Sequence, residues 1–165
     1  MPKIRVTLGQ IDKAIDFLDD YEKKLHKKLE RLVQQLAENG ADIARAYVFN
    51  YGAFNLGDLY GSIAMYREGN KAVIFTDSDH AAFVEFGTGV VGGYNPYPAE
   101  IPVGWSYASG QTINPETGAW FFYNETTKVS GWTQGMPSRP FMWDTAVDLR
   151  RSLVAVARKV FAEND

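Results

Sequence analysis

The strongest constraint in the sequence is a long amphipathic pattern in its first third. Apolar residues recur every three or four positions between Ile11 and Leu36, and charged residues occupy the other face. This spacing is typical of one helix with a single apolar stripe. Thr7 and Gln10 have the spacing of a capping box at its start. The stripe consists of Ile11, Ile15, Leu18, Tyr21, Leu25, Leu29, Leu32, Val33 and Leu36.

The expected end of this helix is Asn39-Gly40, because a glycine after a helical pattern favours a C-terminal stop. The helix would then hold about 28 residues and measure roughly 40 Å at 1.5 Å per residue. Residues 41–47 are expected to resume as a second helix after a break or kink. A helix this long, in a chain of 165 residues that fits one domain, either overhangs the folded body or lies along a neighbouring subunit.

Short strands and a last helix follow. Residues 62–67 and 71–76 alternate around the turn Gly69-Asn70, which predicts a β-hairpin. Residues 79–86 are expected to form a turn of helix or a strand. The last helix is predicted to open at Ser138, which can cap it, with Pro140 in its first turn.

Residues 87–138 differ in kind from the rest, because only four of these 52 positions are charged and aromatic residues crowd them. Asn114 to Gly118 is a strong turn signal. We predict a long hairpin or flap over residues 90–134 that packs on a partner, since a solvated loop should not be so aromatic. Its aromatic residues are Tyr94, Tyr97, Trp105, Tyr107, Trp120, Phe121, Phe122, Tyr123 and Trp132.

Two functions suit such an aromatic stretch. Exposed Trp and Tyr rings stack on sugars or on the bases of single-stranded nucleic acid. Aromatic segments with few charges are more often protein interface or core, which is the interpretation that we favour.

The composition argues against other classes of protein. Cysteine is absent, so the chain holds no disulfide, thiolate nucleophile or cysteine-bound zinc. The net charge of −3 argues against a surface that coats nucleic acid. No apolar run approaches the roughly 20 residues of a membrane span, and no secretory signal is expected.

Catalytic and cofactor motifs are weak. Residues 87–92 match G-x-G-x-x-G, but Pro96 follows so closely that we expect a plain glycine loop and no dinucleotide site. The two histidines, His26 and His80, have too few convergent partners for a metal site, although Asp77 and Asp79 lie near the second. We therefore expect no enzyme activity, no metal and no cofactor.

Two segments decide the functional prediction when they are taken together. The first is Ala82-Phe83-Val84-Glu85-Phe86-Gly87-Thr88-Gly89, and the second is Gly135-Met136-Pro137-Ser138-Arg139-Pro140-Phe141-Met142. With a helix after the second, this order resembles the small tail-completion or head–tail joining family of long-tailed bacteriophages and prophages, whose members are often called minor tail components. Residues 57–63 also resemble that family's entry into its hairpin.

The resemblance implies an α+β fold: a long N-terminal helix, a small antiparallel sheet of hairpins with the aromatic flap, and a C-terminal helix packed on the sheet. It implies a structural protein of the virion neck or tail, assembled in the host cytoplasm, that forms a ring with copies of itself. The implied partners are other head-connector proteins and tail-tube or tail-terminator proteins, while DNA only passes through the lumen. A tail terminator or another minor tail protein is the alternative within this class.

The residues of the two segments also lead to structural predictions. Phe83, Val84 and Phe86 are expected to form a buried anchor, after which Gly87 and Gly89 let the chain turn sharply. Glu85 and Arg139 are isolated charges at the two roots of the flap. Our hypothesis is that they form an ion pair that ties the roots together, and the alternative is two independent solvated charges.

Overall fold

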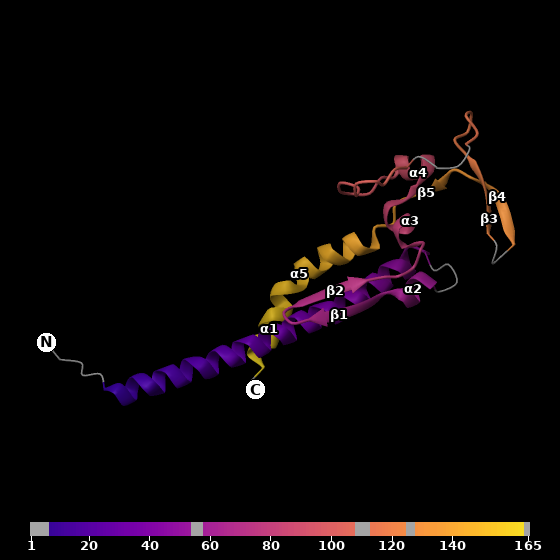
Figure 1. Ribbon diagram of the computed structural model, residues 1–165. Coiled ribbons are helices and arrows are strands. Elements are labelled where there is room, and N and C mark those ends of the chain that lie inside the picture. The colour runs from indigo at the N-terminus through magenta and orange to yellow at the C-terminus, as the bar shows by residue number, and fades with distance from the viewer. Residues whose placement is uncertain (1–6, 54–57, 108–112, 125–127, 164–165) are drawn as a thin grey trace.

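The computed structural model describes residues 7–53, 58–107, 113–124 and 128–163, and its fold is α+β (Figure 1). A long helix carries a hairpin and the C-terminal helix on its second half, and a second hairpin stands at the far end of the molecule (Figure 1). The helices are α1 (Leu8–Asn50), α2 (Asp58–Ser62), α3 (Ala81–Phe86), α4 (Gly89–Tyr94) and α5 (Phe141–Ala162). The strands are β1 (Ala64–Glu68), β2 (Lys71–Phe75), β3 (Trp120–Asn124), β4 (Val129–Thr133) and β5 (Gly135–Met136).

Helix α1 runs for 43 residues without the break that the sequence suggests at Asn39-Gly40, so that prediction is wrong. Gly40 is buried, and a Cβ atom there would lie 2.9 Å from Leu149 Cδ1 of α5 and closer still to Ile74 of β2. This glycine therefore permits close packing inside a helix. The helix ends instead at Asn50, with Tyr51 as its C-cap, and the left-handed φ of +62° at Gly52 suits a C-terminal stop.

The hydrophobic core lies over the C-terminal half of α1. Small residues on this face of the helix let α5 and β2 approach closely, so that much of the buried surface comes from alanine and from a few larger side chains. The core consists of Ala41, Ala44, Val48, Ala53, Leu59, Ile63, Val84 and Phe141.

Hydrogen bonds from two tyrosines fix α5 along α1. The hydroxyl of Tyr47 donates to Asp148 at 2.7 Å, and the hydroxyl of Tyr51 donates to Asp144. Burial raises the pKa of Tyr51, and the hydrogen bond to Asp144 raises it further. The two helices therefore share polar contacts as well as an apolar face.

The two hairpins form two separate two-stranded antiparallel sheets. In the first, Tyr66 pairs with Val73 around the predicted turn, where Gly69 has a φ of +59°. In the second, Phe121 pairs with Trp132. The predicted hairpin at residues 62–76 is confirmed, and near the end of the flap β3 and β4 pair as a second hairpin.

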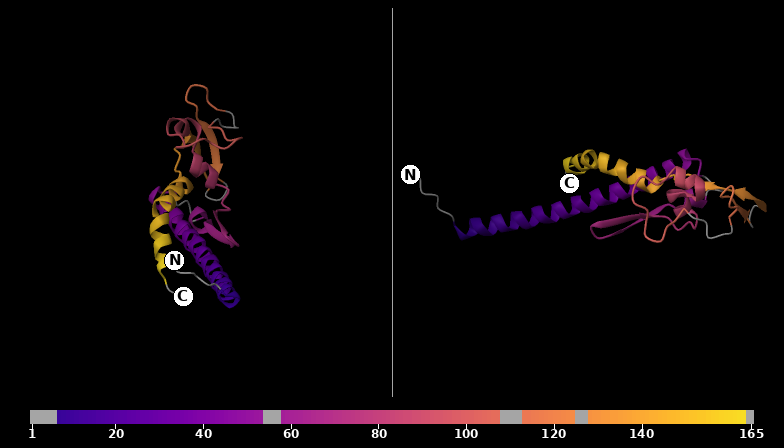
Figure 2. Two further views of the ribbon diagram at one scale, coloured as in Figure 1. Left: turned by 90° about the vertical axis from the view of Figure 1, so that its left-hand side faces the viewer. Right: turned by 90° about the horizontal axis from the view of Figure 1, so that it is seen from above.

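The N-terminal half of α1 extends beyond the rest of the molecule, as the three views in Figures 1 and 2 show. The Gln10 side chain accepts a hydrogen bond from the backbone N–H of Thr7 (2.9 Å), so the expected capping contact is present. No helix within the described ranges has both the length and the apolar content that a membrane span requires. The overhang predicted from the length of the helix is therefore seen.

Candidate functional site

The candidate site is the junction where the two recognised segments meet, together with the surfaces that it connects. At its centre is Glu85, which lies in α3 and is only 6% exposed. Its two carboxylate oxygens accept hydrogen bonds from the backbone N–H groups of Met142 (2.9 Å) and Trp143 (3.0 Å). These groups belong to the first turn of α5, where N–H groups have no partner within the helix. Glu85 therefore caps a helix that begins 56 positions later in the chain.

The hypothesis that Glu85 forms an ion pair with Arg139 is wrong, because Glu85 bonds to other groups. Both residues are described, and no ion pair joins them. The N-cap position of α5 is Pro140, which has no side-chain hydrogen bond to offer the helix. The carboxylate of Glu85 supplies that contact instead, and the favourable field at a helix N-terminus strengthens it.

Backbone contacts complete the tie between the two roots of the flap. The N–H of Arg139 donates to the carbonyl oxygen of Val84 at 2.8 Å. Ser138, which was expected to cap α5, donates its hydroxyl to the carbonyl oxygen of Glu85 at 2.6 Å. Isolated β-bridges join residues 88 and 136, and residues 89 and 135. The roots are thus held together, as predicted, but by main-chain groups and a helix cap.

The close approach of the two roots depends on glycine. Gly87 has a φ of +76°, and a Cβ atom there would lie 2.5 Å from the backbone nitrogen of Ser138. Gly89 and Gly135 also have positive φ values, and each faces backbone atoms of the opposite root. The sharp turns expected at Gly87 and Gly89 are confirmed, whereas the matching role of Gly135 was missed.

Burial controls the protonation of the junction. Desolvation raises the pKa of the Glu85 carboxyl, and the hydrogen bonds from Met142, Trp143 and Tyr97 oppose this effect only in part. Burial also raises the pKa of Tyr97 to about 12, with a further contribution from the charge of Glu85. The two groups therefore share a hydrogen bond in a poorly solvated place.

The predicted anchor of Phe83, Val84 and Phe86 is only partly buried. Val84 belongs to the core, but Phe83 is 45% exposed, because residues 81–86 form a helix and consecutive side chains point in different directions. The rings of Phe83 and Phe86 both contact Trp105, at centroid distances of 5.5 and 5.2 Å. Phe83 and Phe86 thus pack against the flap, whereas Val84 packs inside the core.

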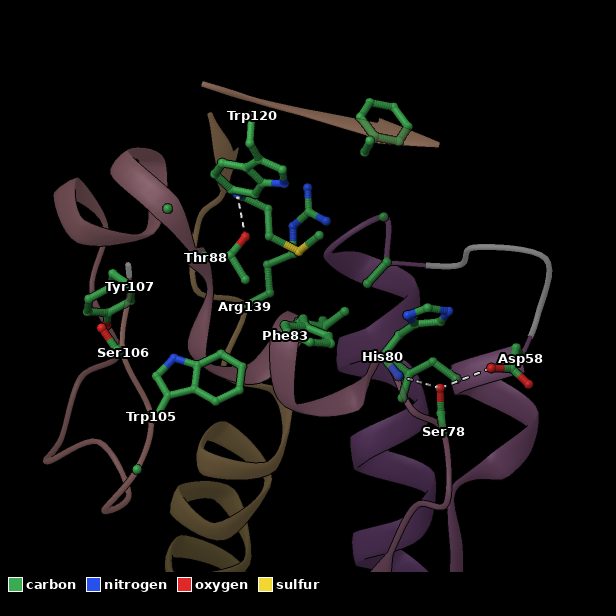
Figure 3. A pocket seen from close by; sticks show the side chains of 18 residues that line it. Asp58, Ser78, His80, Phe83, Thr88, Trp105, Ser106, Tyr107, Trp120 and Arg139 are labelled. Carbon is green, nitrogen blue, oxygen red and sulfur yellow. Dashed lines mark hydrogen bonds between the residues drawn. The ribbon is translucent and has the colours of Figure 1, made fainter. Parts of the chain in front are cut away.

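A cavity of about 970 Å³ lies between this anchor and the flap (Figure 3). Arg139 and Trp120 both line it. On another side Ser78 donates a hydrogen bond to Asp58 (3.0 Å), near the ring of His80. Further lining residues are Phe83, Thr88, Trp105, Tyr107, Phe122 and Met136.

The aromatic residues of the flap divide into two groups. Four of them pack inwards around the junction and the cavity: Tyr97, Trp105, Tyr107 and Trp120. The other five are exposed, namely Tyr94, Phe121, Phe122, Tyr123 and Trp132, although Phe122 also lines the cavity. The turn predicted at Asn114 is confirmed, since its Oδ1 accepts a hydrogen bond from the N–H of Glu116 (2.9 Å).

One face of the β3–β4 hairpin gathers three of the exposed rings. Phe121, Tyr123 and Trp132 are 51%, 55% and 66% exposed, and Phe121 and Trp132 pack edge to face at 5.8 Å. Large aromatic side chains of this kind dominate the energetics of protein interfaces. We call these three residues the hairpin face.

A second apolar surface lies at the opposite end of the molecule, on the overhanging part of α1 (Figure 1). We call residues 8–29 the arm. Its apolar stripe is uncovered over its whole length: Leu8, Ile11, Ile15, Leu18, Tyr21, Leu25 and Leu29 are all exposed. The arm ends where the body begins, since Lys28 donates hydrogen bonds to the carbonyl oxygens of Phe161, in the last turn of α5, and of Glu163, just after that turn.

The chemistry available at the other motifs is limited. No group of three or more His, Asp or Glu side chains within the described ranges is arranged to hold a metal ion. A six-residue helix, α4, does open at Gly89 in the glycine motif, contrary to expectation, but it ends at Tyr94, just before Pro96. His26 faces Glu22 on the exposed surface of α1 at 3.5 Å.

Comparisons with protein-family models, with curated proteins and with solved structures give no match. The family resemblance therefore depends on the sequences of the two segments alone.

Proposed function

We propose that this chain is a structural protein of the head–tail connector of a long-tailed phage or prophage particle, where it joins or completes the tail by assembling into a ring. The observation that carries the proposal is the presence of two unpartnered apolar surfaces, the arm and the hairpin face, at opposite ends of the molecule. The junction at Glu85 joins the roots of the flap to the body by direct hydrogen bonds.

Ring assembly needs two different contact surfaces on each subunit. In a ring, one surface of a subunit binds a different surface of the next, and the repeated rotation closes. The arm is a helix with an aliphatic stripe, whereas the hairpin face is aromatic, so the two surfaces differ in shape and chemistry. A contact in which the arm of one copy meets the flap of the next repeats head to tail.

The hairpin also needs a partner for its own stability. A two-stranded hairpin is marginally stable in water unless it packs on another element. Strands β3 and β4 pair only with each other within the described residues, and their aromatic face is open. A neighbouring subunit, or a tail-tube or tail-terminator protein, would cover this face.

The net charge of −3 is consistent with DNA that passes through the ring without being held. The proposal assigns no catalytic step, cofactor or metal to the protein. It places the protein in the neck or tail of the virion, after assembly in the host cytoplasm. Retention of DNA by the assembled ring at low salt would contradict this part of the proposal.

Head–tail joining in vitro tests the proposal. The gene is deleted from the phage or prophage genome that carries it, and the separate heads and tails are mixed with the purified protein. We expect infectious particles to return with the wild type and to fall at least tenfold with the double variant Phe121→Ser, Trp132→Ser. The matched control is Val154→Ser, which changes an exposed apolar residue on α5. Joining that proceeds equally well without the protein would refute the proposal.

Two further measurements test the alternatives, which are a tail terminator and an aromatic binding module. If particles made without it have tails of uncontrolled length, it is a tail terminator rather than a joining protein. If the intrinsic tryptophan fluorescence shifts on titration with an oligosaccharide or a single-stranded oligonucleotide, and not with heads or tails, the aromatic residues form a binding module for that ligand.

A further inference from the structure

The arm has the sequence pattern of a coiled-coil seam. Its apolar residues follow alternating steps of three and four through Leu8, Ile11, Ile15 and Leu18, and again through Leu25 and Leu29, with Glu22 at the position between. Such a seam is stable in water when a second helix covers it. None of the described residues covers the seam, and its apolar side chains are between 36% and 80% exposed.

The charges of this region are separated along the helix. Residues 12–22 carry five carboxylates and one lysine, whereas residues 23–31 carry five lysine or arginine side chains and one glutamate. One half is therefore strongly acidic, and the following half is equally basic. Two such helices in parallel would place like charges side by side, and two antiparallel helices place the acidic half of each beside the basic half of the other.

The arm also offers enough free length for such a pair. Contacts of α1 with the end of α5 begin at Lys28, so about 20 residues or roughly 30 Å of helix are free, at 1.5 Å per residue. A monomer that exposes a continuous apolar stripe of this length is unusual. A second copy of the same arm provides both the apolar seam and the complementary charges.

We propose that two copies of the free protein pair through their arms as an antiparallel two-helix coiled coil. With the twofold axis near residue 20, Ile11 packs beside Leu29 of the second copy, Ile15 beside its Leu25, and Leu18 beside its Glu22. This register covers the exposed seam from Ile11 to Leu29 and leaves both bodies outside the pair, at opposite ends.

This pairing does not depend on the proposed function. A twofold contact uses the same surface on both copies, whereas a ring contact uses two different surfaces, so the pair is not the contact that closes a ring. It is the state of the free protein, and it protects the arm until another partner replaces it. The hairpin face takes no part in it.

Sedimentation equilibrium or light scattering of the purified chain tests the pairing. We expect the wild type to shift from 18.5 kDa towards twice that mass as its concentration rises. The double variant Ile15→Asp, Leu18→Asp should remain at 18.5 kDa, with its dissociation constant raised at least tenfold. The matched control is Phe17→Asp, because Phe17 is 69% exposed on the other face of the same helix, and this variant should still dimerise.

The orientation is tested by disulfide formation, since the chain has no cysteine of its own. A tagged Ile11→Cys variant is mixed with an untagged Leu29→Cys variant and oxidised. Antiparallel pairing predicts mainly disulfides between the two different variants, and parallel pairing predicts disulfides between identical ones. The circular dichroism of each variant confirms that it is folded.

Two results would overturn the inference: a wild type that stays monomeric at several hundred micromolar, or an oligomer that keeps its mass in the Ile15→Asp, Leu18→Asp variant. Either result leaves head–tail joining untouched, because that assay depends on the hairpin face. Conversely, a confirmed dimer with no activity in joining would refute the proposed function alone.

Discussion

Replacement of Glu85 by glutamine should destabilise the protein far more than replacement of Arg139. Glutamine keeps one acceptor oxygen for the first turn of α5, but its amide nitrogen would face the second backbone N–H. Loss of a hydrogen bond to a charged group costs about 1.5–3 kcal/mol, and a buried N–H without a partner costs about 1–3 kcal/mol. Relief of the buried charge offsets part of this loss, so we expect the free energy of unfolding to fall by about 3 kcal/mol.

Arg139→Gln is the matched variant, because it alters the other isolated charge of the junction without removing a contact to Glu85. Its expected cost is about 0.5 kcal/mol or less, as for most partly exposed side chains outside such networks. Urea unfolding followed by circular dichroism at 222 nm measures both values, and Glu85→Gln should also lower the melting temperature by roughly 9 °C.

A double-mutant cycle gives the decisive comparison. If Glu85 caps α5 and Arg139 is independent of it, the two costs add to within about 0.5 kcal/mol. If the two single variants cost the same and the double variant costs no more than either, the residues are coupled as an ion pair, and the assignment of Glu85 as a helix cap is refuted.

Three further predictions concern packing and pH. Gly40→Ala should lower the free energy of unfolding, although alanine favours a helix by about 1 kcal/mol, because its Cβ atom would collide with α5 and β2; Gly9→Ala, which has open space, should not. Gly87→Ala should cost more than Gly69→Ala in urea unfolding, because both have positive φ but only Gly87 faces the opposite root within 4 Å. The raised pKa of Glu85 means that the folded state holds its proton more tightly than the unfolded chain, so proton binding adds stability below pH 4.5 that is lost as the pH rises through the folded pKa. The cost estimated above for Glu85→Gln applies to the ionised carboxylate, and the difference in stability between wild type and variant, measured from pH 4 to 8, should be larger at the acid end.

Elements with local signals could be predicted from the sequence. The hairpin at residues 64–75 is predicted by alternating apolar and polar residues and by a turn at Gly69. The turn after Asn114 is predicted because an asparagine side chain accepts a hydrogen bond from the backbone two residues later. The length of α1 could not be predicted, because Gly40 is explained by Leu149 and Ile74, which are distant in the sequence. A local rule treats that glycine as a stop, whereas the fold uses it as a contact.

The partner of Glu85 was missed for a related reason. Its hydrogen-bond donors are backbone N–H groups, which every non-proline residue has, so no side chain in the sequence indicates which of them Glu85 binds. One signal was nevertheless available. A helix that starts after Pro140 has no capping side chain at that position, and a lone carboxylate in an apolar stretch is a natural substitute. The charge of Arg139 favoured its side chain as the partner, whereas the partners are backbone N–H groups three and four residues later.

The junction also explains how a flap with few contacts of its own can hold a defined position. Residues 87 and 138 are the two roots of the flap, and both lie within hydrogen-bonding reach of the segment that caps α5. Since α5 is fixed along α1 by Tyr47 and Tyr51, a chain of direct contacts connects the roots of the flap to the helix that carries the arm. The ring that we propose requires a defined angle between the two surfaces, because a variable angle would prevent a ring from closing.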